Sequence, residues 1–274
     1  MSLTAGLFNS GIFEGGLFNG GLFSNTSSQP TTWDLTVVTT GASQDYTVDL
    51  YSGSGVDIYI DWGDSSANSY TSTGQKTHTY ASAGTYTIKI SGAFTSGGNI
   101  RLGSNDGNRS RLKSVYPVPN LNGFTSLSSS LKDCTGITSI PTDLLKYVTQ
   151  VTDLNSFMRS CSGLTGPIPN DLLRYVTQVT DLSYFMYNCT GLDDAVPADL
   201  LRYVVNCLLF SNFALGIRWT TASYSALIIS MNTYLTKTGV PFHGGSSKYN
   251  TSAAADHTNL TSVKTWTITD GGPA

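Results

Sequence analysis

Two adjacent stretches of the chain are nearly copies of each other: TDLLKYVTQVTDLNSFMRSCSGLTGPIP at 142–169 and NDLLRYVTQVTDLSYFMYNCTGLDDAVP at 170–197. A third copy follows as ADLLRYVVNCLLFSNFALG at 198–216, and LSSSLKDCTGITSIP at 127–141 matches the back half of an earlier one. The equivalent residues of the last three copies recur every 28 positions without a gap, as in Asp143, Asp171 and Asp199, and in Phe157, Phe185 and Phe213, and Cys134 of the earlier copy lies 27 residues before Cys161. One unit of this size cannot bury its apolar side chains alone, so the period predicts copies stacked in a row.

Each copy predicts two brief helices and one short strand. The first helix is expected to begin at Thr142 or Asn170 as N-cap, and the second at V-T-D-L, where apolar residues have helical spacing. Those apolar residues are Leu154, Phe157 and Met158, then Leu182, Phe185 and Met186. Gly163 and Gly191 are expected to end the second helix, and the run after each glycine to form the strand.

The segment VTDLSYFMYNCTGL closely resembles the BspA-like leucine-rich repeats of bacterial surface proteins and of some bacteriophage proteins. The resemblance covers about a third of the chain. It implies a small leucine-rich-repeat solenoid over residues 120–216, used for adhesion or as a rigid spacer, and it carries no catalytic residues.

Three of the four cysteines share one position of the repeat: Cys134, Cys161 and Cys189. The chain has no C-x-x-C motif and its histidines are not clustered near the cysteines, so a zinc site is not expected. We expect a column of free, buried thiols. A disulfide between adjacent copies is the alternative.

A basic residue followed by tyrosine also recurs, as Lys146 and Tyr147, Arg174 and Tyr175, and Arg202 and Tyr203. Such a basic-aromatic ladder can bind an acidic sugar through charge and ring stacking. The alternative is structural: each base pairs with the aspartate three residues earlier on a solvated face, and each tyrosine covers the edge of the core. The sequence leaves both interpretations open.

Residues 33–95 alternate apolar and polar side chains in segments such as TVDL, VDIYI and YTIKI, with glycine and serine turns between them. This pattern predicts a small antiparallel β-sandwich. The segments IDWGDSS and HTYASAGTYTIKI resemble the PKD family of immunoglobulin-like domains, which implies a spacer or adhesion module. In it Asp61, Trp62 and Asp64 are expected to form a structural turn, with His78 packed there. A calcium site and a catalytic pair of aspartates are the alternatives.

The chain begins with glycine-hydrophobe-phenylalanine pentads, GLFNS GIFEG GLFNG GLFSN at 6–25. Their phenylalanines recur every five residues, at Phe8, Phe13, Phe18 and Phe23. The period resembles pentapeptide repeats, and similar Gly-Phe pentads occur in phage structural proteins. Flexible linkers seldom carry large aromatics at strict spacing, so residues 1–25 predict a docking or oligomerisation arm rather than a loose Gly-rich tail.

The remaining segments are expected to be a linker at 26–32, a connector at 96–119 and an α/β cap at 217–274. Within the cap, residues 221–239 predict an amphipathic helix that stops at Gly239. A loop, a short helix and a final strand around Trp266 should follow. The segments FHGGSSKY and WTITDGG are similar to the endings that follow such repeats in phage proteins.

Composition restricts the classes of function. Only 12% of residues are charged and the net charge is -3, which provides no electrostatic footprint for nucleic acid. No apolar run approaches the ~20 residues that span a bilayer. The N-terminus has no basic region or unbroken apolar run typical of a secretory signal. No Ser-His-Asp or H-E-x-x-H arrangement is visible in the sequence, so we expect a protein that is not an enzyme and has no cofactor or metal.

Together these features predict a mainly β protein with short helices: arm, immunoglobulin-like sandwich, leucine-rich-repeat solenoid and α/β cap. The expected function is that of a bacteriophage virion component, either a head decoration or spike or a tail fibre. It would sit on the particle surface, contact other virion proteins, favour a trimer and present a surface to a host glycan or protein. A bacterial cell-surface adhesin is the second hypothesis, and a glycan hydrolase the third.

Overall fold

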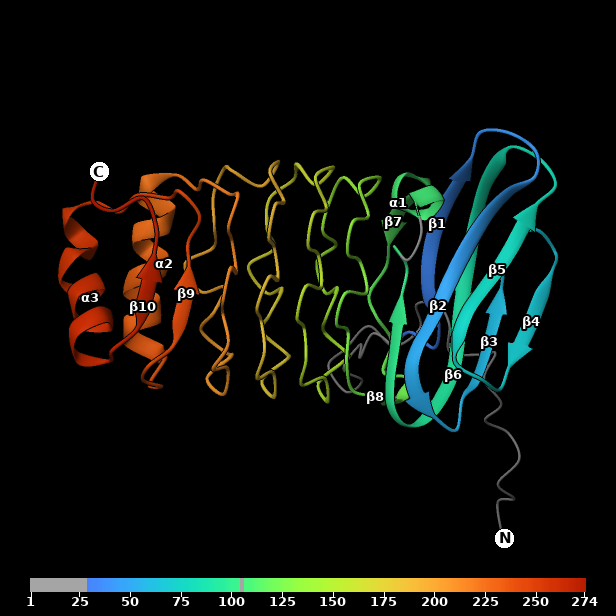
Figure 1. Ribbon diagram of the computed structural model, residues 1–274, viewed down its shortest axis with the longest axis horizontal. Helices are drawn as coiled ribbons and strands as arrows, with labels where there is room; N and C mark the ends of the chain where they lie inside the picture. The colour runs from blue at the N-terminus through green and yellow to red at the C-terminus, as the bar shows by residue number, and fades with distance from the viewer. Residues whose placement is uncertain (1–28, 104–105) are drawn as a thin grey trace, which may run out of the picture.

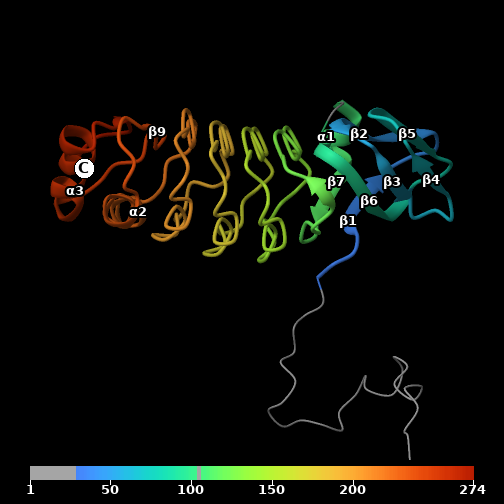
Figure 2. The same ribbon diagram turned by 90° about the horizontal axis from the view of Figure 1, so that it is seen from below.

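The computed structural model describes residues 29–103 and 106–274 as an elongated, mainly β molecule with few short helices (Figure 1). A mostly antiparallel β-unit forms one end, a row of similar coils the middle, and short helices and strands the other end. Figure 2 shows the coils side by side along the long axis. The predicted mainly β class is confirmed. The arm at 1–25, with Phe8, Phe13, Phe18 and Phe23, lies outside the described residues.

The β-unit is an eight-stranded sheet in which β6 is shared by two groups of strands. The strands are β1 (Trp33–Thr39), β2 (Gln44–Ser54), β3 (Asp57–Asp61), β4 (Ala67–Tyr70), β5 (Gly74–Tyr80), β6 (Gly84–Arg101), β7 (Leu112–Val115) and β8 (Asn122–Phe124). The first part of β6 pairs antiparallel with β1 and β3, and its last part pairs antiparallel with β2, which in turn pairs with β5. Because β6 is 18 residues long, it can serve both groups.

Alternating side chains fill the interior of the β-unit. In β1, Trp33, Leu35 and Val37 are fully buried, whereas the residues between them are partly exposed. From the alternating segments TVDL, VDIYI and YTIKI, the fully buried residues are Val48, Leu50, Ile58, Ile60, Ile88 and Ile90. Burying each such side chain contributes about 1.5–3 kcal/mol, so the period-2 pattern supplies the main driving force for this part of the fold.

The expected connector at 96–119 is not a separate linker, and this prediction was wrong. Its first residues complete β6, where Ser96 pairs with Ser54 and Arg101 pairs with Asp49. A short helix, α1 (Asp106–Arg111), leads into β7, which pairs with β1. The β-unit therefore continues past residue 95, because the end of β6 pairs with β2 and because β7 pairs with β1.

The β-unit is joined to the first coil (120–141) by hydrogen bonds. The Ser126 N–H donates to the carbonyl of Gly98 at 3.3 Å, and the Leu102 N–H donates to that of Ser130 at 2.8 Å. The Asn99 side chain is 2% exposed, and its Nδ2 donates to the carbonyl of Ser128 at 3.0 Å. The sheet thus covers the first coil, as the end of a stacked array requires.

Three further coils follow (142–169, 170–197 and 198–216), and each is bonded to its neighbours through the backbone. Parallel bridges link equivalent positions: Ser126, Asp153, Asp181 and Leu209. The N–H groups of Leu154, Ser156, Met158 and Ser160 donate to the third coil, at Asp181, Ser183, Phe185 and Tyr187. The Thr180 N–H donates back to the Thr152 carbonyl at 2.9 Å. Each coil therefore bonds in both directions, as a strand does within a parallel sheet.

The two brief helices expected in each copy do not form anywhere in residues 120–216, which the structure describes throughout. Tight turns replace them: the N–H groups that alternate with the inter-coil donors, such as those of Phe157 and Arg159, donate to the residue three positions earlier. Ser156 and Ser160 have φ values of 57° and 59°, a region in which a right-handed helix cannot continue. The second helix of each copy fails to form because the next coil takes N–H groups that a helix would use internally. The first helix is replaced by a single turn, in which the N–H groups of Lys146, Arg174 and Arg202 donate to the residue three positions earlier.

The strand expected after Gly163 and Gly191 was also misplaced. In the second and third coils the parallel bridges lie at Asp153 and Asp181, within the V-T-D-L segments. These segments were expected to begin a helix. Their backbone is the only part of each of these coils that forms a β-bridge, so V-T-D-L sets the register between copies.

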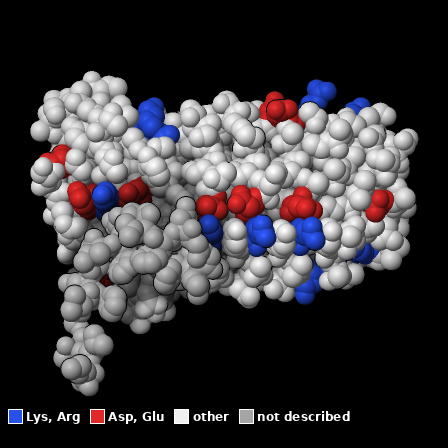
Figure 3. Space-filling model, turned by 180° about the vertical axis from the view of Figure 1, so that it is seen from behind, with Lys and Arg blue, Asp and Glu red and all other residues white. Residues whose placement is uncertain are grey.

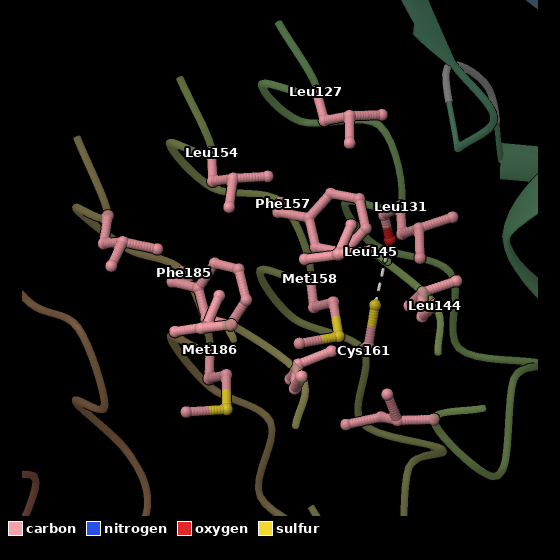
Figure 4. Packing of buried hydrophobic residues seen from close by; sticks show 14 of the residues in the cluster. Leu127, Leu131, Leu144, Leu145, Leu154, Phe157, Met158, Cys161, Phe185 and Met186 are labelled. Carbon is pink, nitrogen blue, oxygen red and sulfur yellow. Dashed lines mark hydrogen bonds between the residues drawn. The ribbon is translucent and has the colours of Figure 1, made fainter. Parts of the chain in front are cut away.

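Columns of equivalent side chains form the interior of the coils (Figure 4). The ring centroids of Phe157 and Phe185 are 5.8 Å apart, and those of Phe185 and Phe213 are 5.7 Å apart. Phe242 continues this column into the C-terminal end at 5.8 Å. All these rings are buried, and each contributes about 1.5–3 kcal/mol that a lone unit would not gain.

The C-terminal end comprises α2 (Thr221–Tyr234), β9 (Pro241–His243), η1 (Thr251–Ala253), α3 (Ala254–Thr258), η2 (Asn259–Val263) and β10 (Thr267–Thr269). The predicted helix is present as α2, but it ends at Tyr234 and not at Gly239. Leu235 adopts an extended conformation, which buries its side chain. The Lys264 ammonium donates to the carbonyls of Asn232 and Leu235, so it binds carbonyls near the end of the helix.

Candidate functional site

The basic-tyrosine ladder lies on the second, third and fourth coils, with one pair in each. A single turn positions each base: the N–H groups of Lys146, Arg174 and Arg202 donate to the carbonyls of Asp143, Asp171 and Asp199 at 3.0–3.1 Å. Because this hydrogen bond recurs in three coils, each base lies on the same edge three residues after an aspartate. Figure 3 shows a face of the molecule on which acidic and basic side chains form two neighbouring rows along its length.

Two of the three bases are held by aspartate. Lys146 Nζ lies 3.2 Å from Asp143 Oδ2, and this hydrogen bond raises the pKa of Lys146. Arg202 Nη1 lies 3.4 Å from an oxygen of Asp199. Among the described residues, no carboxylate lies within salt-bridge distance of Arg174. The structural interpretation of the ladder therefore accounts for its two ends but not for its centre.

Aromatic rings flank the bases. The guanidinium carbon of Arg174 lies 5.7 Å from the ring centroid of Tyr175 and 5.8 Å from that of Tyr203. Arg202 lies 5.6 Å from Tyr203 and 4.2 Å from Tyr234. Cation–π attraction at these distances restrains the guanidinium groups. The first pair has the same form, with Lys146 Nζ 5.4 Å from the ring of Tyr147.

Tyr234 was missed as a ladder residue. The sequence predicted only an amphipathic helix over 221–239, whereas Tyr234 is 37% exposed and contacts Arg202. Its place beside Arg202 depends on how α2 packs on the fourth coil, and the repeat period does not reveal that packing.

A depression of about 360 Å³ opens beside Arg174. It is lined by Asn170, Asp171, Arg174, Pro197, Ala198, Asp199 and Tyr203. A guanidinium, two carboxylates, an amide and a tyrosine thus meet around a small apolar surface. Its volume lies at the low end of ligand sites, about 300–1,000 Å³, which suits one or two sugar residues.

The predicted turn of the β-unit is held by its own carboxylates. Asp61 Oδ1 accepts the Gly63 N–H at 2.9 Å, and Asp64 Oδ1 accepts the Ser66 N–H at 3.1 Å. Asp64 Oδ2 lies 2.7 Å from Nε2 of His78. Desolvation opposes ionisation of Asp64, but the hydrogen bonds from Ser66 and His78 outweigh it and lower the pKa of this carboxyl.

Trp62 completes this turn. Its ring is fully buried and stacks on His78 with 5.0 Å between ring centroids. Its carbonyl accepts the Tyr80 hydroxyl at 2.9 Å. Within residues 29–103 and 106–274, no three His, Cys, Asp or Glu side chains gather in a way that suits a metal ion.

All four cysteines are buried and free, so the alternative of a disulfide between copies was wrong. Cys161 Sγ donates to the carbonyl of Leu131 at 2.9 Å, and Cys189 Sγ donates to that of Met158 at 2.9 Å. Burial raises the pKa of the Cys161 thiol well above its usual value and raises the pKa of Cys207 to about 12. These thiols are poor nucleophiles because reactivity requires the thiolate.

The C-terminal end contains a polar cluster that sequence reasoning did not find. Asp270 accepts the Tyr224 hydroxyl at 2.9 Å and lies 3.3 Å from His257 Nε2. The ring of Tyr249 stacks on His257 at 4.4 Å. The cluster ties α2 and α3 to the segment that follows β10, and the large sequence separation of these residues concealed it.

The fourth coil departs from the repeat at its bridge position. Thr and Asp at this position in the second and third coils are replaced by Leu208 and Leu209, which are 47% and 46% exposed. Val205, three residues before Leu208 in the chain, is 40% exposed. The coil therefore carries a small apolar surface where its neighbours carry hydroxyls and carboxylates.

Comparison with protein-family models, curated proteins and solved structures finds no match to this chain. Among the described helices, none has the length and apolar character required to cross a bilayer. Inference about function therefore depends on the geometry of the chain itself.

Proposed function

We propose that the protein is a non-enzymatic structural and adhesive component of a bacteriophage particle, either a head decoration or spike or a tail fibre. The arm at 1–25 anchors it to other virion proteins, and the β-unit and coils extend from the particle. In this proposal the β-unit is a PKD-like immunoglobulin sandwich and the coils are BspA-like leucine-rich repeats. A host surface glycan or protein is the partner at the exposed face.

The observation that carries the proposal is the continuous interior from the β-unit to the C-terminal end. Leu102 and Ser130 join the first coil to the sheet, and the column from Phe157 ends on Phe242. A stack closed at both ends in this way is suited to a stiff spacer. The basic-aromatic ladder gives that spacer a repeated polar surface along its side.

The proposal is tested on purified particles with an antibody against residues 33–274. We expect the full chain in the particle at a fixed copy number and a variant lacking residues 1–25 to be absent from it. Incorporation of the truncated chain at full occupancy would overturn the anchor, and absence of the full chain from particles would overturn the virion assignment. Light scattering of the isolated protein tests the trimer.

A bacterial cell-surface adhesin is the second candidate, favoured by the resemblance of the repeats to bacterial surface proteins. It predicts that the protein fractionates with the cell envelope rather than with particles. Release of reducing ends from a host polysaccharide would instead support the glycan hydrolase.

A further inference from the structure

We propose that the depression beside Arg174 is a binding subsite for a carboxylate-bearing sugar, such as a uronic acid residue of an acidic surface polysaccharide. The inference deepens the proposed function and rests on it, because it identifies the chemistry of the ligand that the displayed face contacts. The subsite lies where the third and fourth coils meet, between Arg174 and Arg202 of the ladder.

Arg174 differs from the other two bases of the ladder because no described carboxylate pairs with it. Lys146 and Arg202 are each held by an aspartate, at 3.2 and 3.4 Å, so a ligand would have to compete with an existing ion pair. The guanidinium carbon of Arg174 lies 5.7 and 5.8 Å from the ring centroids of Tyr175 and Tyr203, and these rings attract the guanidinium without accepting hydrogen bonds from its N–H donors. A guanidinium presents these donors as a fork that matches the two oxygens of a carboxylate.

The other lining groups suit a sugar ring. Tyr203 offers an aromatic face, and Pro197 and Ala198 offer a small apolar surface for the C–H face of the ring. Asn170 and Asp171 border the same depression and can accept hydrogen bonds from sugar hydroxyls. A sugar that carries one carboxylate and several hydroxyls therefore matches this site, in which the cation Arg174 is surrounded by hydrogen-bond acceptors.

The same charges disfavour polyanions. Two carboxylates, from Asp171 and Asp199, border the depression together with Arg174. At the surface, like charges about 4 Å apart repel by roughly 1–4 kcal/mol. Asp199 is paired with Arg202, so the carboxylate of Asp171 is the group that opposes a polyanion such as a nucleic acid backbone. A singly charged ligand places its carboxylate on the guanidinium and its hydroxyls toward the acids.

The test is calorimetric titration of the full chain with an oligogalacturonate and with its methyl ester, which keeps the hydroxyls but removes the charge. We expect the acid form to bind with one site per chain, and the ester to bind at least tenfold more weakly. Arg174→Gln should weaken binding of the acid form at least tenfold. Lys146→Gln, the equivalent base held by its aspartate, is the matched control and should bind as the parent does.

Tyr203→Leu, checked for folding by its thermal unfolding curve, should weaken both the acid and the ester severalfold because it removes the ring. Equal affinity for acid and ester, an unchanged affinity of the Arg174→Gln variant, or no binding of the acid at millimolar concentration would each overturn the subsite. The particle assay is independent of this titration, so failure of the subsite and failure of the virion assignment give different results.

Discussion

The thiol of Cys189 donates a hydrogen bond to the carbonyl oxygen of Met158, 2.9 Å away in the preceding coil. The same oxygen accepts the N–H of Cys161 at 3.1 Å. The cysteine column therefore links successive coils through side chain and backbone together. A small side chain that can donate a hydrogen bond suits this position, because the cysteines are buried in a closely packed interior.

Replacing Cys189 by alanine should lower the free energy of unfolding by about 1–2.5 kcal/mol, since it removes both the sulfur volume and the donor. Cys189→Ser is the matched control because its hydroxyl can still donate to Met158, and it should lose less. Urea denaturation of the parent, Cys189→Ser and Cys189→Ala proteins measures their order of stability. If serine is tolerated no better than alanine, the hydrogen bond does not contribute to stability.

Stability should fall at alkaline pH. Burial raises the pKa of the Cys207 thiol to about 12, and it also raises the pKa values of Cys134 and Cys161. In the unfolded chain a thiol loses its proton near pH 8.5, so from that pH upward the unfolded state binds fewer protons than the folded state. The free energy of unfolding is therefore highest below about pH 8.5 and decreases as the pH rises toward the folded pKa values.

The expected slope is at most about 1.4 kcal/mol per thiol per pH unit. Denaturation at pH 7, 9 and 10 measures it, and Cys207→Ser should make the slope shallower. A thiol reagent at pH 8 should modify none of the four cysteines until the protein is unfolded. Rapid labelling of the native protein would contradict the buried column.

Gly216 is required by the backbone of the fourth coil. Its φ is 91°, and a Cβ atom there would lie 2.3 Å from Oδ1 of Asn188. Gly216→Ala should therefore cost about 1–3 kcal/mol, measured as a shift in the urea midpoint. Gly166→Ala is the control, because the nearest atom to its Cβ would be 3.6 Å away, and it should change stability by less than about 1 kcal/mol.

The repeat period predicted much of this fold because it depends on side-chain identity alone. The Phe157, Phe185 and Phe213 column is a direct consequence of equal spacing and a shared apolar position. Helix and turn could not be distinguished in the same way. Apolar residues at i, i+3 and i+4 suit the observed turns as well as a helix, and the hydrogen bonds that decide between them run to residues about 28 positions away.

The candidate site was predicted in part. The six ladder residues were found by periodicity, but the difference between Arg174 and its neighbours was not. That difference depends on ion pairs and rings contributed by the adjacent coil, and Tyr234 depends on where α2 lies. Neither is a property of spacing along the chain.

Asp64 should make stability depend on pH in the acid range. Its folded pKa is lowered, so the unfolded state binds more protons as the pH falls below its unfolded pKa of about 3.9. The contribution of this carboxylate is present above that value and is lost as the pH falls through the folded pKa. Asp64→Asn should cost about 0.5–1 kcal/mol at pH 7, a figure reduced for partial exposure, and show a shallower loss below pH 4.

Denaturation at pH 7, 4 and 3 measures both effects. Asp57→Asn, at an exposed position of β3, is the control and should leave stability within about 0.5 kcal/mol. If stability fell equally steeply below pH 4 in the parent and Asp64→Asn proteins, the Asp64 carboxylate would not be the source of the pH dependence.

Restoring the repeat at Leu209 should restore a missing hydrogen bond. Asp153 Oδ1 accepts the Asn155 N–H at 2.9 Å, and Asp181 Oδ1 accepts the Ser183 N–H at 2.7 Å. A carboxylate at position 209 would lie two residues before the N–H of Ser211, in the same arrangement. Repulsion from Asp181 across the parallel bridge opposes this gain, but both side chains border solvent, where such repulsion is about 1 kcal/mol or less.

The comparison that isolates the carboxylate is Leu209→Asp against Leu209→Ala, because both variants remove the same half-exposed leucine side chain. We expect the aspartate variant to be more stable than the alanine variant by about 0.5–1.5 kcal/mol at pH 7, measured by urea denaturation. The difference should shrink as the pH falls below about 4, where the new carboxyl becomes protonated. Equal stability of the two variants at pH 7 would mean that the fourth coil does not adopt the bridge geometry of the second and third.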